Sequence, residues 1–198
     1  MTMSDDGYGS GPIAARGCVT SLMVVRAGGP PEAVPAMIER DRLHMAARPG
    51  LYLKLLPVLP EPAKHQVLTG GAYLFDTVEH AAAFDHWAAH EFAIDGVPFV
   101  RQPLLESRVA KVWEVIGAEN FRPVAGHQVM MRMEEWRRPP GLDRAALARD
   151  WPGLRDDARA AGLSAAWLLW SGERGELGLV TAGDRAGTPD PAAPDLVS

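Results

Sequence analysis

The sequence of 198 residues has little cysteine, little lysine and no long apolar run. Its single cysteine, Cys18, excludes an internal disulfide framework and a cysteine-based metal cluster. No stretch approaches the ~18 uninterrupted apolar residues of a membrane span. The segment 1–17 has no apolar core and carries Asp5 and Asp6, so it does not resemble a secretory signal. We therefore expect a cytoplasmic protein without a membrane partner.

The sequence also lacks a strong excess of acidic or basic side chains. The formal net charge is −5, and no basic patch stands out at the scale of the chain, so we expect no nucleic-acid partner. Apolar residues make up 47% and charged residues 23%, which is ordinary for a globular protein with a real core. The sequence has no Walker A loop, no GxSxG elbow and no GxGxxG after a strand. These absences exclude the common nucleotide-binding and hydrolase signatures.

The first part of the chain predicts one α+β unit after a disordered arm over residues 1–16. Strands rich in β-branched and apolar residues alternate with helical patterns, and Pro and Gly mark the turns between them. Thr77 is the predicted N-cap of the second helix. The elements follow the β-α-β-β-α-β order of a ferredoxin-like unit. They are a strand 18–26, a helix 31–48, a hairpin 51–59 and 67–76, a helix from 77 and a strand 106–115.

The second part predicts a truncated repeat of that unit. A strand 127–136, a helix 142–161 and a hairpin 164–170 and 176–181 repeat the order β-α-β-β and then stop. The domain prediction is therefore one ferredoxin-like unit over 17–120, a second, incomplete unit over 121–182 and a Pro/Asp-rich tail over 183–198. A ferredoxin-like sheet covers one face with its helices and must bury the other face against something. Two such sheets would form a dimeric-type α/β barrel, and the incomplete second unit favours a homodimer.

Two segments carry a family resemblance. Pro49-Gly50-Leu51-Tyr52-Leu53-Lys54 and Gly70-Gly71-Ala72-Tyr73-Leu74-Phe75-Asp76, followed by a helix, resemble the monooxygenases of the dimeric α/β-barrel superfamily. The resemblance covers residues 18–117. With its degenerate second unit, the chain also resembles the oxygenases that open the B ring of angucyclines in aromatic polyketide biosynthesis.

This resemblance implies an oxygenase that uses O₂ and reduced flavin (FADH2 or FMNH2) on a polycyclic quinone or hydroquinone, with a flavin reductase as a possible partner. The superfamily also contains cofactor-free anthrone oxygenases, haem-degrading enzymes, polyketide cyclases and proteins without known activity, so fold alone does not give the reaction. The flavin-dependent and cofactor-free readings both stay open.

The candidate catalytic pair is Asp41 and His44. Proteins of this superfamily bind ligands between the sheet and its helices, so polar residues on the core-facing side of a helix matter most. Asp41 lies in the middle of the apolar stripe of the first helix and His44 lies at its edge. As i, i+3 neighbours, the carboxylate can orient the imidazole as a general base. The alternative is a surface pair of Asp41 with Arg40 or Arg42.

Other side chains are candidates for substrate binding. Aromatic rings suit a flat substrate, although most such residues belong to the core. A loop histidine can lie at a pocket mouth. The candidates are Tyr52, Tyr73, Phe75, His65 and Trp113.

His86 and His90 have the i, i+4 spacing of metal ligands, but they lie off the apolar face of the second helix. We expect no metal site. The leading hypothesis is a tailoring oxygenase of aromatic polyketide biosynthesis. The alternatives are a polyketide cyclase of the same fold and a non-catalytic ligand-binding barrel.

Overall fold

The computed structural model describes residues 9–26, 36, 44, 48–55, 58–61, 66–124 and 129–184. These residues form two compact units. Unit 1 runs from Ala15 to Glu114, and unit 2 contains the residues up to Ala14 and those from Val115 onward. Among the described residues, no helix is long and apolar enough to cross a membrane.

Unit 1 is an antiparallel sheet covered by one described helix. Its strand order is β3-β5-β2-β8, and β4 also pairs with β5. The last strand, β8, begins in unit 1 and ends in unit 2. The strands are β2 (Gly17–Val25), β3 (Leu51–Leu55), β4 (Val58–Glu61), β5 (Gln66–Phe75) and β8 (Leu105–Asn120).

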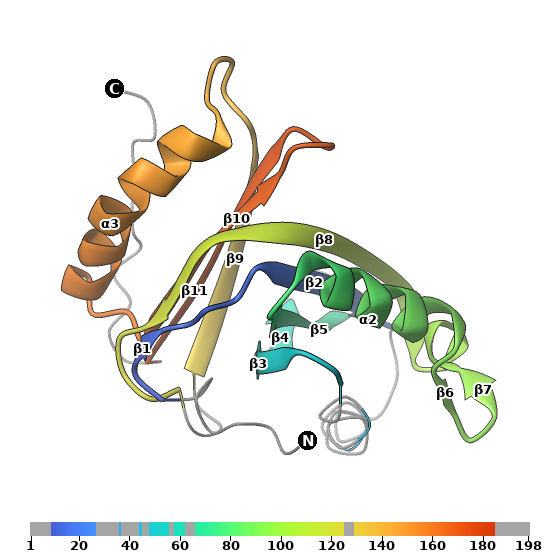
Figure 1. Cartoon of the computed structure of the whole chain (residues 1–198). Coiled ribbons are helices and arrows are strands. Elements are labelled where there is room, and N and C mark those ends of the chain that lie inside the picture. Colours follow the sequence, from blue (N-terminus) through green and yellow to red (C-terminus); the bar gives the residue numbers. More distant parts are fainter. Residues whose placement is uncertain are drawn as a thin grey trace. The chain divides into compact units, whose positions relative to one another are not determined.

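Helix α2 (Val78–His90) begins directly after its N-cap residue, Thr77. The Thr77 side chain accepts a hydrogen bond from the backbone N–H of His80 at 3.1 Å, which satisfies a donor that the first turn leaves without a partner. The helix then buries an alanine–phenylalanine face, Ala81, Phe84 and Ala88, against the sheet (Figure 1). This confirms the predicted cap.

The core of unit 1 lies between α2 and the sheet. Tyr73 and Phe75 of β5 both contact the Phe84 ring. The centroid of the Phe84 ring lies 4.7 Å from that of Tyr73 and 5.4 Å from that of Phe75. A short segment after α2 closes the end of this core through Phe92 and Phe99. That segment contains β6 (Ala93–Ile94), β7 (Val97–Pro98) and the 3₁₀ helix η3 (Phe99–Arg101).

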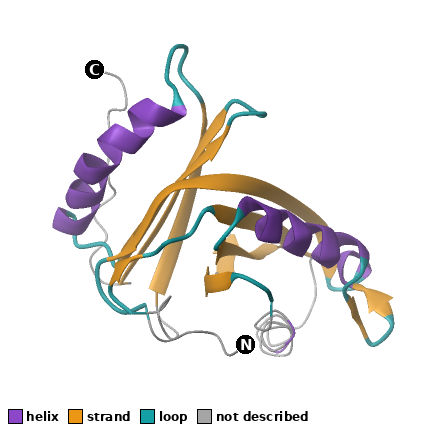
Figure 2. Ribbon diagram, viewed as in Figure 1, coloured by secondary structure: helices purple, strands orange, loops and turns teal. Residues whose placement is uncertain are grey.

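Unit 2 repeats the architecture with fewer elements. Its strand order is β8-β10-β11-β9, and a short strand also pairs with β8. Helix α3 packs on the sheet through its contacts with β10 (Figure 2). The elements are β1 (Gly11–Pro12), β9 (Val129–Arg137), α3 (Arg144–Ala160), β10 (Ala165–Ser171) and β11 (Glu176–Asp184).

Helix α3 begins at Asp143, whose carboxylate accepts a hydrogen bond from the backbone N–H of Ala146 at 2.7 Å. The helix continues through Pro152 and Gly153, two residues of low helix propensity. Packing sustains it there, because the flanking side chains of Trp151 and Leu154 pack against the core cluster of unit 2, which contains the fully buried Leu147. Among the described side chains of this helix, Leu147 alone is fully buried, and it lies in the N-terminal part.

The described elements match the predicted α+β order closely. Part of the predicted disordered arm is ordered, since Gly11–Pro12 pair with Asn120 and Glu119. The predicted strand 106–115 extends to Asn120, past Gly117. Ala36 and His44 are helical, whereas Arg48, the last residue of the predicted first helix, is not. The other residues of that helix lie outside the described residues, as do most of the predicted arm and tail.

Candidate functional site

A cavity of about 280 Å³ lies in unit 2 between α3 and its sheet. Its floor is built by cross-strand neighbours of β9, β11 and β10. One row joins Arg132, Thr181 and Ala166, and the next joins Glu134, Leu179 and Leu168. Because every second residue of a strand faces the same side, all six face α3. A third row follows the same register: Trp136, Leu177 and Trp170.

These rows give the cavity a polar end and an apolar end. Arg132 and Glu134 form an ion pair beside Thr181 at one end. Trp136 of the third row lines the cavity farther along the strands, and Leu168 and Leu179 share the second row with Glu134. A flat ring with a polar substituent fits such a gradient, because its apolar body and its oxygen each meet a matching wall.

Small side chains open the cavity. Ala158 of α3, Ala161 just after the helix and Ala166 of β10 all line it, where larger apolar side chains would fill the space. Leu147 fills the corresponding space at the N-terminal end of the helix. Helix α3 is therefore packed at its start and lined by a cavity in its C-terminal half.

Trp151 forms one wall of the cavity and rests on β8. A Cβ atom at Gly117 would come within 2.3 Å of the Trp151 indole, so glycine is required for this contact. The tryptophan ring thereby packs directly on the strand backbone. The rest of the wall is Leu154 and Asp157 of the same helix.

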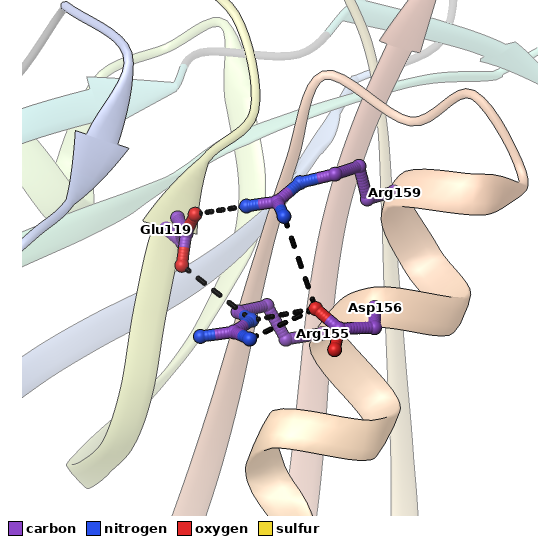
Figure 3. A network of polar contacts seen from close by, with 4 residues as sticks. All are labelled: Glu119, Arg155, Asp156 and Arg159. Atoms are coloured by element: carbon purple, nitrogen blue, oxygen red, sulfur yellow. Dashed lines mark hydrogen bonds and ion pairs between the residues drawn. The ribbon is translucent and has the colours of Figure 1, made fainter.

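Ion pairs hold the C-terminal half of α3 to β8. The buried carboxylate of Glu119 accepts a hydrogen bond from Arg159 at 2.5 Å and lies 3.8 Å from Arg155. Asp156 pairs with both arginines, at 2.9 Å from Arg155 and 3.8 Å from Arg159 (Figure 3). A partly buried carboxylate with two guanidinium partners is a strong and directional contact. It fixes the helix at the end where the cavity leaves it with little apolar packing.

The described part of the chain does not test the predicted catalytic pair, Asp41 and His44. Asp41 lies outside the described part of the chain. His44 is exposed, and its ring centroid lies 5.8 Å from that of Phe92 in unit 1. The structure instead brings together an aspartate–histidine pair that the sequence analysis missed, Asp76 and His80, at 2.6 Å. The i, i+4 spacing of these two residues across the Thr77 cap was the available signal.

The predicted substrate-binding residues all belong to unit 1. Tyr73 and Phe75 are buried in its core, and Tyr52 is half-buried on β3. Trp113 is 1% exposed, and its indole N–H donates to the Thr20 hydroxyl at 2.7 Å. His65 lies outside the described residues. None of the described four lines the cavity beneath α3.

Three further residues, Cys18, His86 and His90, lack the features of a catalytic or metal-binding group. Burial raises the pKa of the Cys18 thiol far above its ordinary value, so this cysteine is unreactive in the folded chain. The rings of His86 and His90 lie 4.7 Å apart on the exposed side of α2. Within the described part of the chain, no group of three or more His, Cys, Asp or Glu side chains could hold a metal ion.

No protein-family model matches the chain, and no curated protein matches it. Among solved structures, it is similar to a "Putative monooxygenase" from Fusobacterium nucleatum subsp. nucleatum ATCC 25586, with a TM-score of 0.59 and 12% identity over 87% of this chain and 78% of the other. An anthrone oxidase-like protein matches with a TM-score of 0.49 and 16% identity, over 85% of this chain and 74% of the other. At 12% identity, the first similarity is one of fold.

The contact between Gly117 and Trp151 gives a first prediction. Gly117→Ala will displace the Trp151 ring and lower the free energy of unfolding by about 1–3 kcal/mol, because the added methyl overpacks the wall. The change in Trp emission and the unfolding midpoint in denaturant both report it. The matched control is Gly153→Ala in α3, the helix that carries Trp151, where the new methyl meets nothing within 4 Å. That variant should gain about 0.4–1 kcal/mol. Equal stability of Gly117→Ala and wild type would contradict the packing described for the wall.

Proposed function

We propose that the chain is an oxygenase that oxidises a flat polycyclic phenol, quinone or hydroquinone with O₂. The observation that carries the proposal is the cavity beneath α3, which has indole walls from Trp136 and Trp151 and an Arg132–Glu134–Thr181 polar end. Indole rings stack on flat aromatic ligands, and a guanidinium stabilises a phenolate oxygen. The fold that the chain shares with the Fusobacterium nucleatum protein supports the same class of reaction. Fold analogy adds to this argument but does not carry it.

The proposed arrangement extends the ferredoxin-like reading of the sequence. Each unit would be one such α+β layer, and the substrate would lie between helix and sheet of the second, truncated unit. The angucycline ring-opening oxygenases supply one substrate class for this cavity, and hydroxylated anthrones supply a smaller one.

A resident flavin does not fit the described residues of this cavity. At about 280 Å³ it lies at the lower end of the roughly 300–1,000 Å³ range of small-molecule sites, so it accommodates one ring system and not a flavin and a substrate together. We therefore favour oxygenation without a bound flavin, and the experiment below separates the two readings.

In this reading the protein supplies position and a base, and the substrate carbanion reacts with O₂ itself. Glu134 is the half-buried carboxylate of the cavity and is the proposed acceptor of the substrate proton. Arg132 and Thr181 would hold the phenolate oxygen. With an anthrone, the ring methylene and O₂ give a ring carbonyl and water: one oxygen atom enters the product, and the other leaves with the two hydrogens.

Oxygen uptake tests the proposal directly. Protein is given a hydroxylated anthrone or an angucyclinone, with and without a flavin reductase, FAD and NADH, and products are followed by mass. We expect protein-dependent uptake without the reductase system. Protein-dependent uptake only with the reductase system would indicate an oxygenase that depends on reduced flavin. A skeleton that loses water under anaerobic conditions would indicate the cyclase, and an unchanged bound ligand would indicate a binding protein.

Filling the cavity should weaken substrate binding. Ala158→Leu projects an isobutyl group into the space, so we expect the turnover at subsaturating substrate to fall at least tenfold through a higher KM. Ala160→Leu is the matched control, because Ala160 is exposed on the same helical turn. Steady-state oxygen uptake measures both variants. Equal losses in the two variants, or no loss in either, would place the substrate elsewhere.

The proposed base gives a separate prediction. Glu134→Gln keeps the shape of the side chain but cannot accept a proton, so kcat should fall about 10²-fold while substrate affinity changes little. Glu134→Asp should restore part of the rate. The control is Glu135→Gln, which changes the exposed neighbour on the opposite face of β9. An unchanged kcat in Glu134→Gln would remove this residue from the mechanism.

A further inference from the structure

A second cavity lies in unit 1 and is independent of the one beneath α3. It has a volume of about 100 Å³ and lies where the first turns of α2 meet the segment before β3. Two charged or ionisable side chains face it, and the remaining walls are apolar. Its lining residues are Arg48, Pro49, His80, Ala83, Phe84 and Trp87.

The imidazole of His80 is held in one orientation by Asp76. The His80 Nδ1 and the Asp76 carboxylate oxygen are 2.6 Å apart, and the backbone N–H of Asp76 donates to the carbonyl of Gly50 at 2.9 Å. Gly50 has a φ of +72°, and a Cβ there would come within 2.1 Å of the Asp76 carboxylate. The backbone thus leaves room for the pair. With Nδ1 engaged, Nε2 is the ring nitrogen left to meet a ligand.

The guanidinium of Arg48 is fixed by an aromatic face. Its central carbon lies 3.2 Å from the centroid of the Trp87 ring, and Trp87 in turn stacks on Phe92 at 4.5 Å. Burial lowers the pKa of Arg48, and the nearby charge of Glu91 opposes that effect. A guanidinium presents its N–H donors as a planar fork that can bind a carboxylate in two places.

We propose that this cavity binds a small carboxylic acid with an apolar body. The carboxylate would meet the Arg48 fork and His80 Nε2, and the body would pack on Ala83 and Phe84. A tetrahedral, strongly hydrated phosphate fits less well, because the walls other than Arg48 and His80 offer only apolar surface. The cavity volume leaves room for several water-sized groups, which suits a single ring or a short chain.

Benzoate is the probe, with benzamide and inorganic phosphate as comparators. Histidine side-chain NMR follows the His80 imidazole in the full chain, and calorimetry gives the affinity. We expect a saturable shift of the His80 signals with benzoate and none with benzamide or phosphate. The signals of His86 and His90, on the exposed part of the same helix, should not move and serve as internal references.

Variants locate the site. Arg48→Ala and His80→Gln should each weaken benzoate binding at least tenfold, whereas Arg101→Ala and His90→Gln, which change exposed residues of the same unit, should stay within twofold. If Arg48→Ala does not fold, Arg48→Lys replaces it, and the wild-type His80 shift stands without any variant. No His80 shift, equal shifts with phosphate, or binding that survives both substitutions would overturn the proposal. Ala158→Leu should leave benzoate binding unchanged, so this test and that of the oxygenase proposal fail separately.

Discussion

The ion pairs that Glu119 makes with Arg155 and Arg159 are the contact on which the candidate site in unit 2 depends. Helix α3 has one fully buried side chain, Leu147, and that side chain lies near its N-terminus. Farther along, the alanines at 158 and 161 leave space where apolar packing would otherwise hold the helix. A helix end that gains little from burial needs another anchor, and a buried carboxylate with two guanidinium partners provides one. Polar anchoring thereby allows the cavity to exist.

The two units use one helix-on-sheet arrangement with opposite results. In unit 1, Phe84 of α2 packs over Tyr73 and Phe75 of β5, and the cavities that described residues line there are small. In unit 2, the equivalent layer between α3 and the sheet contains alanine, and the strands present Arg132 and Glu134 beside Trp136. A large, graded cavity suits a ring system, whereas a small one with Arg48 and His80 suits a compact acid. Side-chain size at a few positions of the helices, rather than backbone topology, therefore separates the two proposed ligands.

The order of the elements could be predicted from the sequence because local signals were strong: β-branched runs, Pro-Gly stops, and the cap at Thr77. The site could not be predicted in the same way. The polar end of the cavity comes from alternation in β9 combined with its register against β11, which joins Arg132 to Thr181 across 49 positions of sequence. The cavity itself arises because alanine side chains are too small to fill the space. An alanine in the sequence does not indicate which residue lies opposite it in the fold. Asp76 and His80 were close in sequence, but a pair that spans a helix cap is hidden from a search within one helical face.

The most direct test of the central claim is a crystal structure of the chain with anthraquinone, an oxidised ring system that cannot turn over. The account predicts the rings between α3 and the sheet of unit 2, against Trp136 and Trp151, with a ring oxygen directed toward Arg132 and Thr181. Rings bound at any other place, at a concentration that saturates binding in solution, would contradict it. In that case the alanines that open the cavity would need another explanation, and the oxygenase proposal would lose the observation that carries it.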